Sequence, residues 1–159
     1  MLIIFCAEIE EAQNLDCPRA KIVITGPGLV NVIQTPRVKV RPTDKLINVG
    51  YAGSNKYNVG DIISVDSCER LFPSYTVDEP TIKLVPCDYS DMCYTADNFL
   101  SENINREIPL IDMELYYLAS IYPQMESLKI VSDNLNYKEY KEFNFTSSWG
   151  YVNKILRRL

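Results

Sequence analysis

The stretch Pro109-Leu110-Ile111-Asp112-Met113-Glu114 joins a short apolar run to a pair of carboxylates. Its apolar residues predict a buried strand at 110–113. A helix is expected from Glu114 to Ile121, where Tyr122-Pro123 ends it. Open α/β sheets bind ligands beyond the carboxyl ends of their strands. We therefore expect Asp112, Met113 and Glu114 to lie at a ligand site.

Two other apolar runs end in the same manner. Lys45–Val49 is followed by Gly50 and Gly53, and Ser127–Val131 is followed by Ser132 and Asp133. Glycine at a strand end allows a sharp turn or a close approach of the backbone to a ligand. The three strand ends are therefore expected to meet at one site.

Strands alternate with helices along the rest of the chain. Further strands are predicted at 2–7, 21–25, 62–65 and 92–95, and further helices at 8–15, 29–35 and 147–159, the last with Ser147 as its N-cap. Residues 36–45 are expected to form a loop or an edge strand, 68–89 a loop over the site or an extra strand pair, and 134–144 a polar connection. This alternation predicts an α/β three-layer sandwich with a central mixed sheet, and the length of 159 residues suits one domain over 1–159.

The composition narrows the possible partners. A formal net charge of −5 argues against nucleic acid, whose phosphates are bound mainly by Lys and Arg. No apolar run approaches the ~18 residues that span a bilayer, so no membrane partner is expected. The apolar residues 2–7 follow no basic segment and run into Glu8, so they indicate a buried strand rather than a signal peptide, and a cytoplasmic location is expected.

The chemistry available to the chain is limited by its side chains. It contains no histidine, and its five cysteines form no CxxC pair, so neither a metal site nor a disulfide framework is predicted. Acid–base chemistry would have to use carboxylates, Tyr, Lys or Cys. No metal or organic cofactor is expected.

Six separated stretches, in the correct order, resemble the nucleoside phosphorylase and nucleosidase superfamily, and most closely its methylthioadenosine/S-adenosylhomocysteine nucleosidase branch. The resemblance implies a phosphorylase/hydrolase-like fold and cleavage of an N-glycosidic bond in a purine nucleoside or 5′-thionucleoside. The stretches are Ala7–Ala12, Thr25–Gly28, Ile47–Ser54 followed by Val59–Ile62, Ala96–Phe99, Asp112–Glu114 and Val131–Asp133.

The resemblance also implies roles for single residues. Asp133 would protonate N7 of the departing purine as general acid, and Glu11 would activate or orient the attacking water. Glu114 would accept hydrogen bonds from the ribose 2′ and 3′ hydroxyls. The other expected substrate-binding residues are Met113 against the sugar, Phe99 stacked on the base, backbone groups near Leu100, and Gly50, Ala52, Gly53 and Ser132.

The nucleophile position distinguishes hydrolysis from phosphorolysis. Phosphorolytic relatives place an arginine two residues before the strand-end glycine, because phosphate needs a fixed cation, whereas this chain has Asn48 there. With Glu11 nearby we favour water. A phosphate-dependent phosphorylase and a non-catalytic nucleoside-binding protein remain the alternatives.

The chain also departs from the family pattern. It is shorter than ordinary members, so dimerisation of the family type is only a possibility. An R-H-H-D-like stretch is replaced by Asp66–Arg70, Tyr51 stands where relatives have a small residue, and Asn136 stands where an Asp is common. Simpler explanations also exist for the carboxylates. Glu10 and Glu11 could be a solvated pair in the first turn of a helix, and Asp112 and Glu114 could cap one. A further alternative is an interaction module formed by the tyrosines at 116, 117, 137 and 140.

Overall fold

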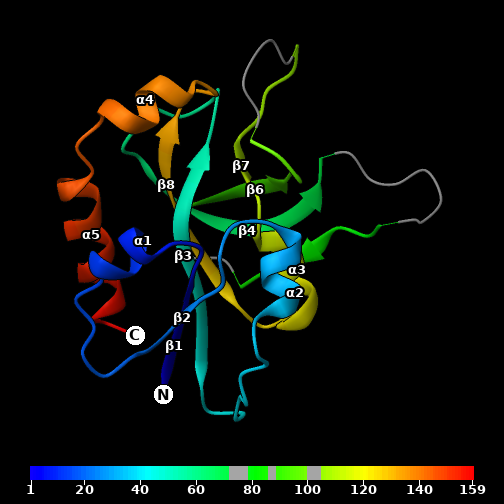
Figure 1. Cartoon of the computed structure of the whole chain (residues 1–159), viewed down its shortest axis with the longest axis vertical. Helices are drawn as coiled ribbons and strands as arrows, with labels where there is room; N and C mark the ends of the chain where they lie inside the picture. The colour runs from blue at the N-terminus through cyan, green and yellow to red at the C-terminus, as the bar shows by residue number, and fades with distance from the viewer. Residues whose placement is uncertain (72–78, 86–88, 100–104) are drawn as a thin grey trace.

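The structure is a computed structural model of the chain that describes residues 1–71, 79–85, 89–99 and 105–159 (Figure 1). Leu100, which we expected to read the base, lies outside the described residues. Within them, no helix is both long enough and apolar enough to cross a bilayer.

The described residues form a mixed sheet of eight strands with five short helices. The strands are β1 (Leu2–Cys6), β2 (Lys21–Ile24), β3 (Lys45–Gly53), β4 (Ile62–Arg70), β5 (Ile82–Lys83), β6 (Ser90–Thr95), β7 (Leu110–Asp112) and β8 (Glu126–Asp133). The helices are α1 (Ile9–Gln13), α2 (Leu29–Gln34), α3 (Leu115–Ile121), α4 (Tyr137–Glu142) and α5 (Thr146–Leu156). The α/β class and the mixed sheet are confirmed.

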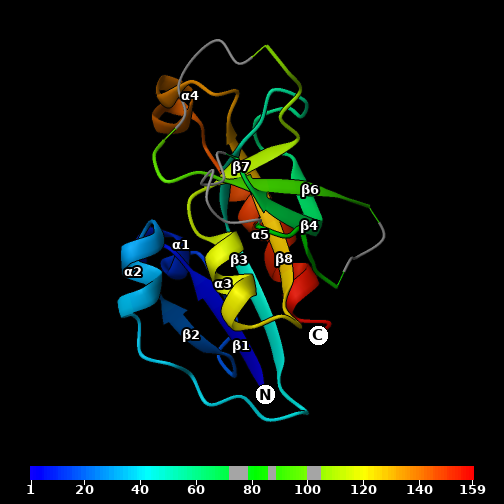
Figure 2. The same ribbon diagram turned by 90° about the vertical axis from the view of Figure 1, so that its right-hand side faces the viewer.

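The centre of the sheet closes on itself, which the predicted three-layer sandwich does not describe. The strand order is β2-β1-β3-β7-β6-β4-β5, and β8 pairs with both β3 and β4. The strands β3, β7, β6, β4 and β8 therefore form a ring. β8 runs parallel to β3 and antiparallel to β4 (Figure 2). Ile130 of β8 is paired with Ile62 of β4. A ring has an inside and an outside, so β8 has one side chain face turned into the ring.

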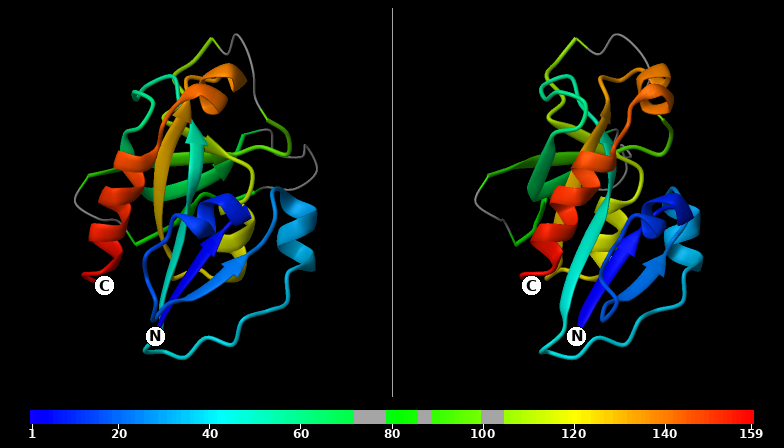
Figure 3. Two further views of the ribbon diagram at one scale, coloured as in Figure 1. Left: turned by 60° about the vertical axis from the view of Figure 1, so that its left-hand side comes forward. Right: turned by 90° about the vertical axis from the view of Figure 1, so that its left-hand side faces the viewer.

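Two cores cover the two faces of the parallel strands. Along β1, Ile3 and Phe5 belong to one core and Ile4 and Cys6 to the other, all at most 1% exposed. This confirms the predicted buried strand and shows that both of its faces are covered. The first core takes in α2 and α3 and the second takes in α5, on opposite sides of β1 and β3 (Figures 1 and 3).

Several element boundaries differ from the prediction. β3 continues through Gly53 and β4 through Arg70, because neighbouring strands of the ring offer hydrogen-bond partners past the apolar runs. A helix, α4, stands in the expected polar connection, and the Asn136 side chain accepts a hydrogen bond from the Lys138 N–H at its start. α5 begins at Thr146, whose N–H donates to Asn144, so Ser147 is not the N-cap.

Two other segments answer open predictions. Residues 36–44 form a loop, and Ile82–Lys83 is a strand paired antiparallel with β4 in the segment where an extra strand pair was one option. Tyr116 and Tyr117 are 8% and 7% exposed and belong to the first core, so they do not form the surface that an interaction module would need.

The cores predict a contrast between two isoleucines. Ile4→Ala removes a side chain that is 0% exposed and should lower the free energy of unfolding by about 2–5 kcal/mol. Ile33→Ala, at a position 58% exposed, should change it by less than about 0.5 kcal/mol. Urea denaturation of both variants measures the difference, and equal costs would contradict the assignment of Ile4 to a packed core.

Candidate active site

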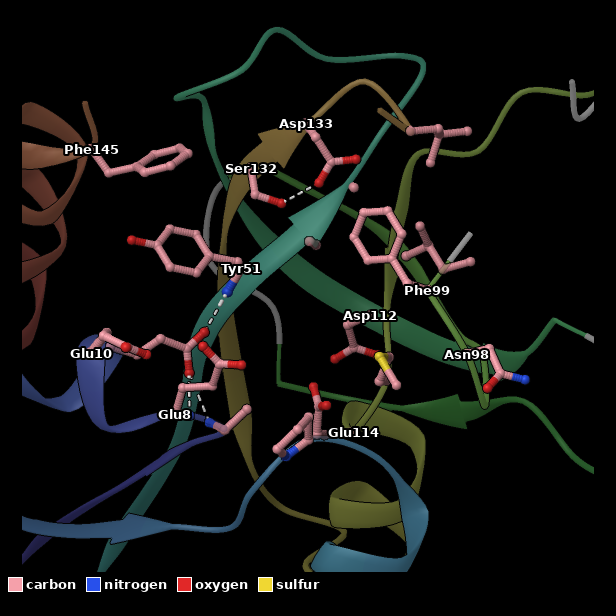
Figure 4. A pocket seen from close by; sticks show the side chains of 18 of the residues that line it. Glu8, Glu10, Tyr51, Asn98, Phe99, Asp112, Glu114, Ser132, Asp133 and Phe145 are labelled. Carbon is pink, nitrogen blue, oxygen red and sulfur yellow. Dashed lines mark hydrogen bonds between the residues drawn. The ribbon is translucent and has the colours of Figure 1, made fainter. Parts of the chain in front are cut away.

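A cavity of about 580 Å³ opens at the carboxyl ends of β1, β3, β7 and β8 (Figure 4). Its volume lies in the range of small-molecule sites, about 300–1,000 Å³. The structure brings the predicted site residues together here, with two exceptions. Gly50 does not line the cavity, and Leu100 is outside the described residues. The predicted residues that line the cavity are Glu11, Ala52, Gly53, Phe99, Met113, Glu114, Ser132 and Asp133.

Glu11 is a buried carboxylate fixed by backbone groups. Its Oε2 accepts hydrogen bonds from the Ala7 and Glu8 N–H groups at 2.8 and 3.0 Å, and its Oε1 accepts one from the Tyr51 N–H at 3.0 Å. It is 3% exposed, so a solvated first-turn glutamate is not what the structure shows. Burial raises the pKa of Glu11, whereas these hydrogen bonds and Lys129 favour its ionised form.

Gly50 makes room for this carboxylate. A Cβ atom at position 50 would lie 2.8 Å from Glu11 Oε1, closer than van der Waals contact allows. Gly50 therefore lets the Glu11 carboxylate pack against the backbone of β3. Gly50 itself does not line the cavity. Its place in the predicted site is indirect.

Asp133 ends β8 and is 1% exposed. The Ser132 hydroxyl donates to its Oδ2 at 2.6 Å, and the Asn136 N–H donates to its Oδ1 at 3.2 Å. Asn136 thus holds Asp133 through its backbone, while its side chain caps α4. Burial raises the pKa of Asp133, and these hydrogen bonds lower it in part. Gly53 keeps the neighbouring space open, since a Cβ there would lie 3.1 Å from Asp133 Oδ1.

Glu114 lies at the start of α3 and is 7% exposed. Its Oε1 accepts a hydrogen bond from the Gly28 N–H at 2.8 Å, in the turn before α2. Burial and then the neighbouring Asp112 raise the pKa of Glu114 to about 7. In the view of Figure 4, Glu114 and Asp133 lie at opposite ends of the cavity.

A buried ion pair lies beside Glu114. Lys129 Nζ is 2.7 Å from Asp112 Oδ2, and both side chains are 1% exposed. Sequence reasoning did not single out Lys129. A lysine between Leu128 and Ile130, within an apolar run predicted to be a strand, was the available signal.

Aromatic rings form two walls of the cavity. On one side Tyr51 packs against Phe145, with ring centroids 4.8 Å apart, and its hydroxyl accepts a hydrogen bond from Trp149 Nε1. Phe99, which is 45% exposed, lies on the other side (Figure 4). Phe145 was not predicted, because it reaches the site from the start of α5 and belongs to none of the strand-end motifs.

The carboxylates of the site are not arranged as a metal centre. Among the described residues, no group of three or more Cys, Asp or Glu side chains could hold a metal ion. The arrangement suits proton transfer and hydrogen bonding, with Asp133 and Glu114 favouring protonation more than exposed carboxylates do.

The raised pKa of Glu114 predicts a pH-dependent stability. Between about pH 4.5 and 7 the folded protein holds a proton on Glu114 that the unfolded chain releases, so stability falls as pH rises through this window. The full difference is about 3 kcal/mol, since one pKa unit corresponds to about 1.4 kcal/mol. Glu114→Gln removes this contribution and keeps an acceptor for Gly28. Urea denaturation from pH 4.5 to 8 should give a flatter curve for Glu114→Gln, and parallel curves would contradict the burial of an ionisable Glu114.

Comparison with known proteins identifies the fold. No protein-family model matches the sequence, and a search of curated proteins gives no match. Among solved structures, the Chlamydia trachomatis MTAN bound to adenine matches with a TM-score of 0.75 and 14% identity over 97% of this chain and 96% of that one. The 5′-methylthioadenosine/S-adenosylhomocysteine nucleosidase of Helicobacter pylori, with butyl-thio-DADMe-Immucillin-A, matches with a TM-score of 0.75 and 12% identity over 99% and 98%.

A third neighbour extends the comparison to another nucleosidase. Futalosine hydrolase of Helicobacter pylori strain 26695 matches with a TM-score of 0.74 and 11% identity over 99% of this chain and 97% of that one. The similarity covers nearly the whole length of each protein. At these low sequence identities it is a similarity of fold. The chain has the nucleoside phosphorylase/nucleosidase fold, in the form found in methylthioadenosine/S-adenosylhomocysteine nucleosidases.

Proposed function

We propose that this protein hydrolyses the N-glycosidic bond of a purine nucleoside or 5′-thionucleoside. Water attacks C1′ of the ribose, the C1′–N9 bond breaks, and its electron pair goes to the base. Asp133 delivers a proton to N7 of the departing base, and Glu11 takes the proton from the water. The products are the free base and the free sugar, with no cofactor consumed.

The observation that carries this proposal is the convergence of three buried carboxylates on one cavity. Glu11, Glu114 and Asp133 come from three separate elements, are at most 7% exposed, and all line the same space. Burial favours the protonated form of Asp133, as a general acid requires. A carboxylate near the sugar also stabilises positive charge that develops on the ring.

Glu11 has the acceptor capacity that orienting a water needs. A carboxylate offers about four lone-pair sites, and three N–H groups of the described residues occupy three of them. The site that remains on Oε1 can accept a hydrogen bond from water. Fixed backbone donors hold the carboxylate in place, so the water would be held in one position.

Two observations favour water over phosphate as the nucleophile. Asn48, at the position where phosphorolytic relatives have arginine, is 2% exposed, donates to the Phe5 carbonyl oxygen and does not line the cavity. Lys129 is 1% exposed, is paired with Asp112 and does not line the cavity, so it cannot contact a phosphate. A phosphate dianion would instead meet the carboxylate of Glu11.

The remaining cavity residues suit a nucleoside. Glu114 uses one acceptor site for Gly28, and its other lone pairs can accept bonds from two adjacent ribose hydroxyls. Met113 lies beside it on the cavity wall, and Phe99 offers a ring face for a purine. The structural neighbours include an adenine complex and two kinds of nucleosidase, which supports this class of substrate.

The first test is base release from adenosine, inosine, methylthioadenosine and S-adenosylhomocysteine, with and without phosphate. We expect release without phosphate, and a loss of about 10²–10⁴-fold in kcat for Asp133→Asn, which keeps the shape but cannot act as the acid. Asp16→Asn, which changes an exposed carboxylate paired with Arg157, is the matched control and should keep full activity.

Each other outcome points to a different function. Base release that depends strictly on phosphate would support a phosphorylase. Binding of adenine or nucleosides without turnover by the folded protein would support a non-catalytic nucleoside-binding protein. Trp149 is the chain's single tryptophan and touches Tyr51 of the cavity wall, so its fluorescence can report such binding.

Gly50→Ala should uncouple folding from turnover. The added methyl group would displace the Glu11 carboxylate from its three N–H donors, so kcat should fall at least about tenfold, because misplacing a catalytic group by about 1 Å can cost 10²-fold. Gly150→Ala is the control, since nothing lies within 4 Å of a Cβ there. Unchanged turnover in folded Gly50→Ala would contradict the role of Glu11.

A further inference from the structure

Lys129 is a buried cation inside the strand ring. Along β8, Leu128 and Ile130 belong to the core under α5, so Lys129 between them points to the opposite face. Val131 shares that face and packs with Cys68, Cys93 and other residues of the first core. Lys129 is 1% exposed and does not line the cavity, so it cannot touch a ligand directly.

Asp112 connects this cation to the site. One carboxylate receives three groups from three elements: Lys129 Nζ of β8 at 2.7 Å, the Thr95 hydroxyl of β6 at 2.7 Å, and the Leu115 N–H of α3 at 3.0 Å. Met113 and Glu114 lie between Asp112 and Leu115 in the chain. The Asp112 side chain is fixed by Lys129 and Thr95, and it also accepts the hydrogen bond from Leu115 at the other end of this short segment. These contacts therefore set the position of Met113 and Glu114.

The charges of these neighbouring residues also affect the ionisation of Glu114. Asp112 and Glu11 both disfavour a negative charge on Glu114, and Lys129 favours it. Lys129 also lowers the pKa of the thiols at positions 6, 68 and 93. Burial raises each of these pKa values by more, so the thiols stay neutral near pH 7. Burial opposes a charge on Lys129, yet its carboxylate neighbours raise its pKa overall, so it remains a cation. Its charge therefore favours ionised Glu114 and opposes the effect of Asp112 and Glu11.

We propose that Lys129 is a positioning residue, which acts through Asp112 to hold the β7–α3 junction and through its charge to make ionised Glu114 available as an acceptor. The use of that acceptor for ribose hydroxyls rests on the proposed function. The effect on Glu114 itself does not, and it can be measured without turnover.

The test is a carbon-13 NMR titration of the Glu114 carboxyl group, identified by the signal lost in Glu114→Gln. Removing the cation in Lys129→Met should raise the Glu114 titration midpoint by about one pH unit or more, because opposite charges close to a carboxyl shift it by about 1–3 units. Asp112→Asn should lower it. Lys129→Arg keeps the charge and should leave the midpoint near that of wild type, as should Lys154→Met, which removes an exposed lysine of α5.

Opposite shifts separate a charge effect from loosened packing, which would move both variants in the same direction. If Lys129→Met does not fold, the comparison passes to Asp112→Asn against Asp112→Asn/Lys129→Met, where no buried carboxylate is left without its partner. Loss of Lys129 should raise the midpoint there as well. An unchanged midpoint on loss of Lys129, in either background, overturns the inference.

Base release by the same proteins keeps the two proposals distinguishable. A shifted midpoint in a protein that releases no base under any condition supports the role of Lys129 and refutes the hydrolase. Turnover with a Glu114 titration midpoint that does not change on loss of Lys129 supports the hydrolase and refutes the role of Lys129. Where both hold, Lys129→Met should lose activity and Lys129→Arg should recover most of it.

Discussion

The double pairing of β8 is the constraint on which the rest of the structure depends. This strand bonds to β3 along one edge and to β4 along the other, and so closes the ring. Closure directs one face of β8 outward to α5 and the other inward, which is why its apolar residues divide between two cores and Lys129 is enclosed. It also brings Asp133 beside Gly53 at the end of β3. One strand thus closes the ring, carries the buried cation and ends in the candidate general acid.

The site exists because several buried charges are stabilised locally. An unpaired carboxylate in a protein interior is costly, and here each receives fixed donors: three N–H groups for Glu11, Ser132 and Asn136 for Asp133, and Gly28 for Glu114. The hydrogen bonds from these donors lower the three pKa values, but the loss of solvent on burial outweighs them, so all three pKa values are raised. Backbone donors also allow little movement, so the site combines altered protonation with fixed geometry.

The sequence predicted the position of the site better than its surroundings. Apolar runs that end in glycine or carboxylates placed Gly53, Glu114 and Asp133 at strand ends, and the cavity lies there. Glu11 was harder to assign, since a glutamate in the first turn of a helix is usually solvated. Its burial depends on Gly50, 39 residues later in the chain, and Lys129 and Phe145 were missed because their roles depend on contacts from distant elements. Ring closure could not be predicted from periodicity, which reports how a strand is covered and not which strands pair.

The amino-acid sequence by itself determined the α/β class, the strands that carry the site, the absence of histidine chemistry and the order of motifs that resemble nucleosidases. These properties follow from local patterns of burial and from side-chain chemistry. Only the tertiary structure decided that the strands form a ring, that Lys129 pairs with Asp112, and that Glu11, Glu114 and Asp133 share one cavity. The physical reason is that pairing, burial and pKa depend on groups far apart in the chain, and their distances are set only when β8 closes the sheet.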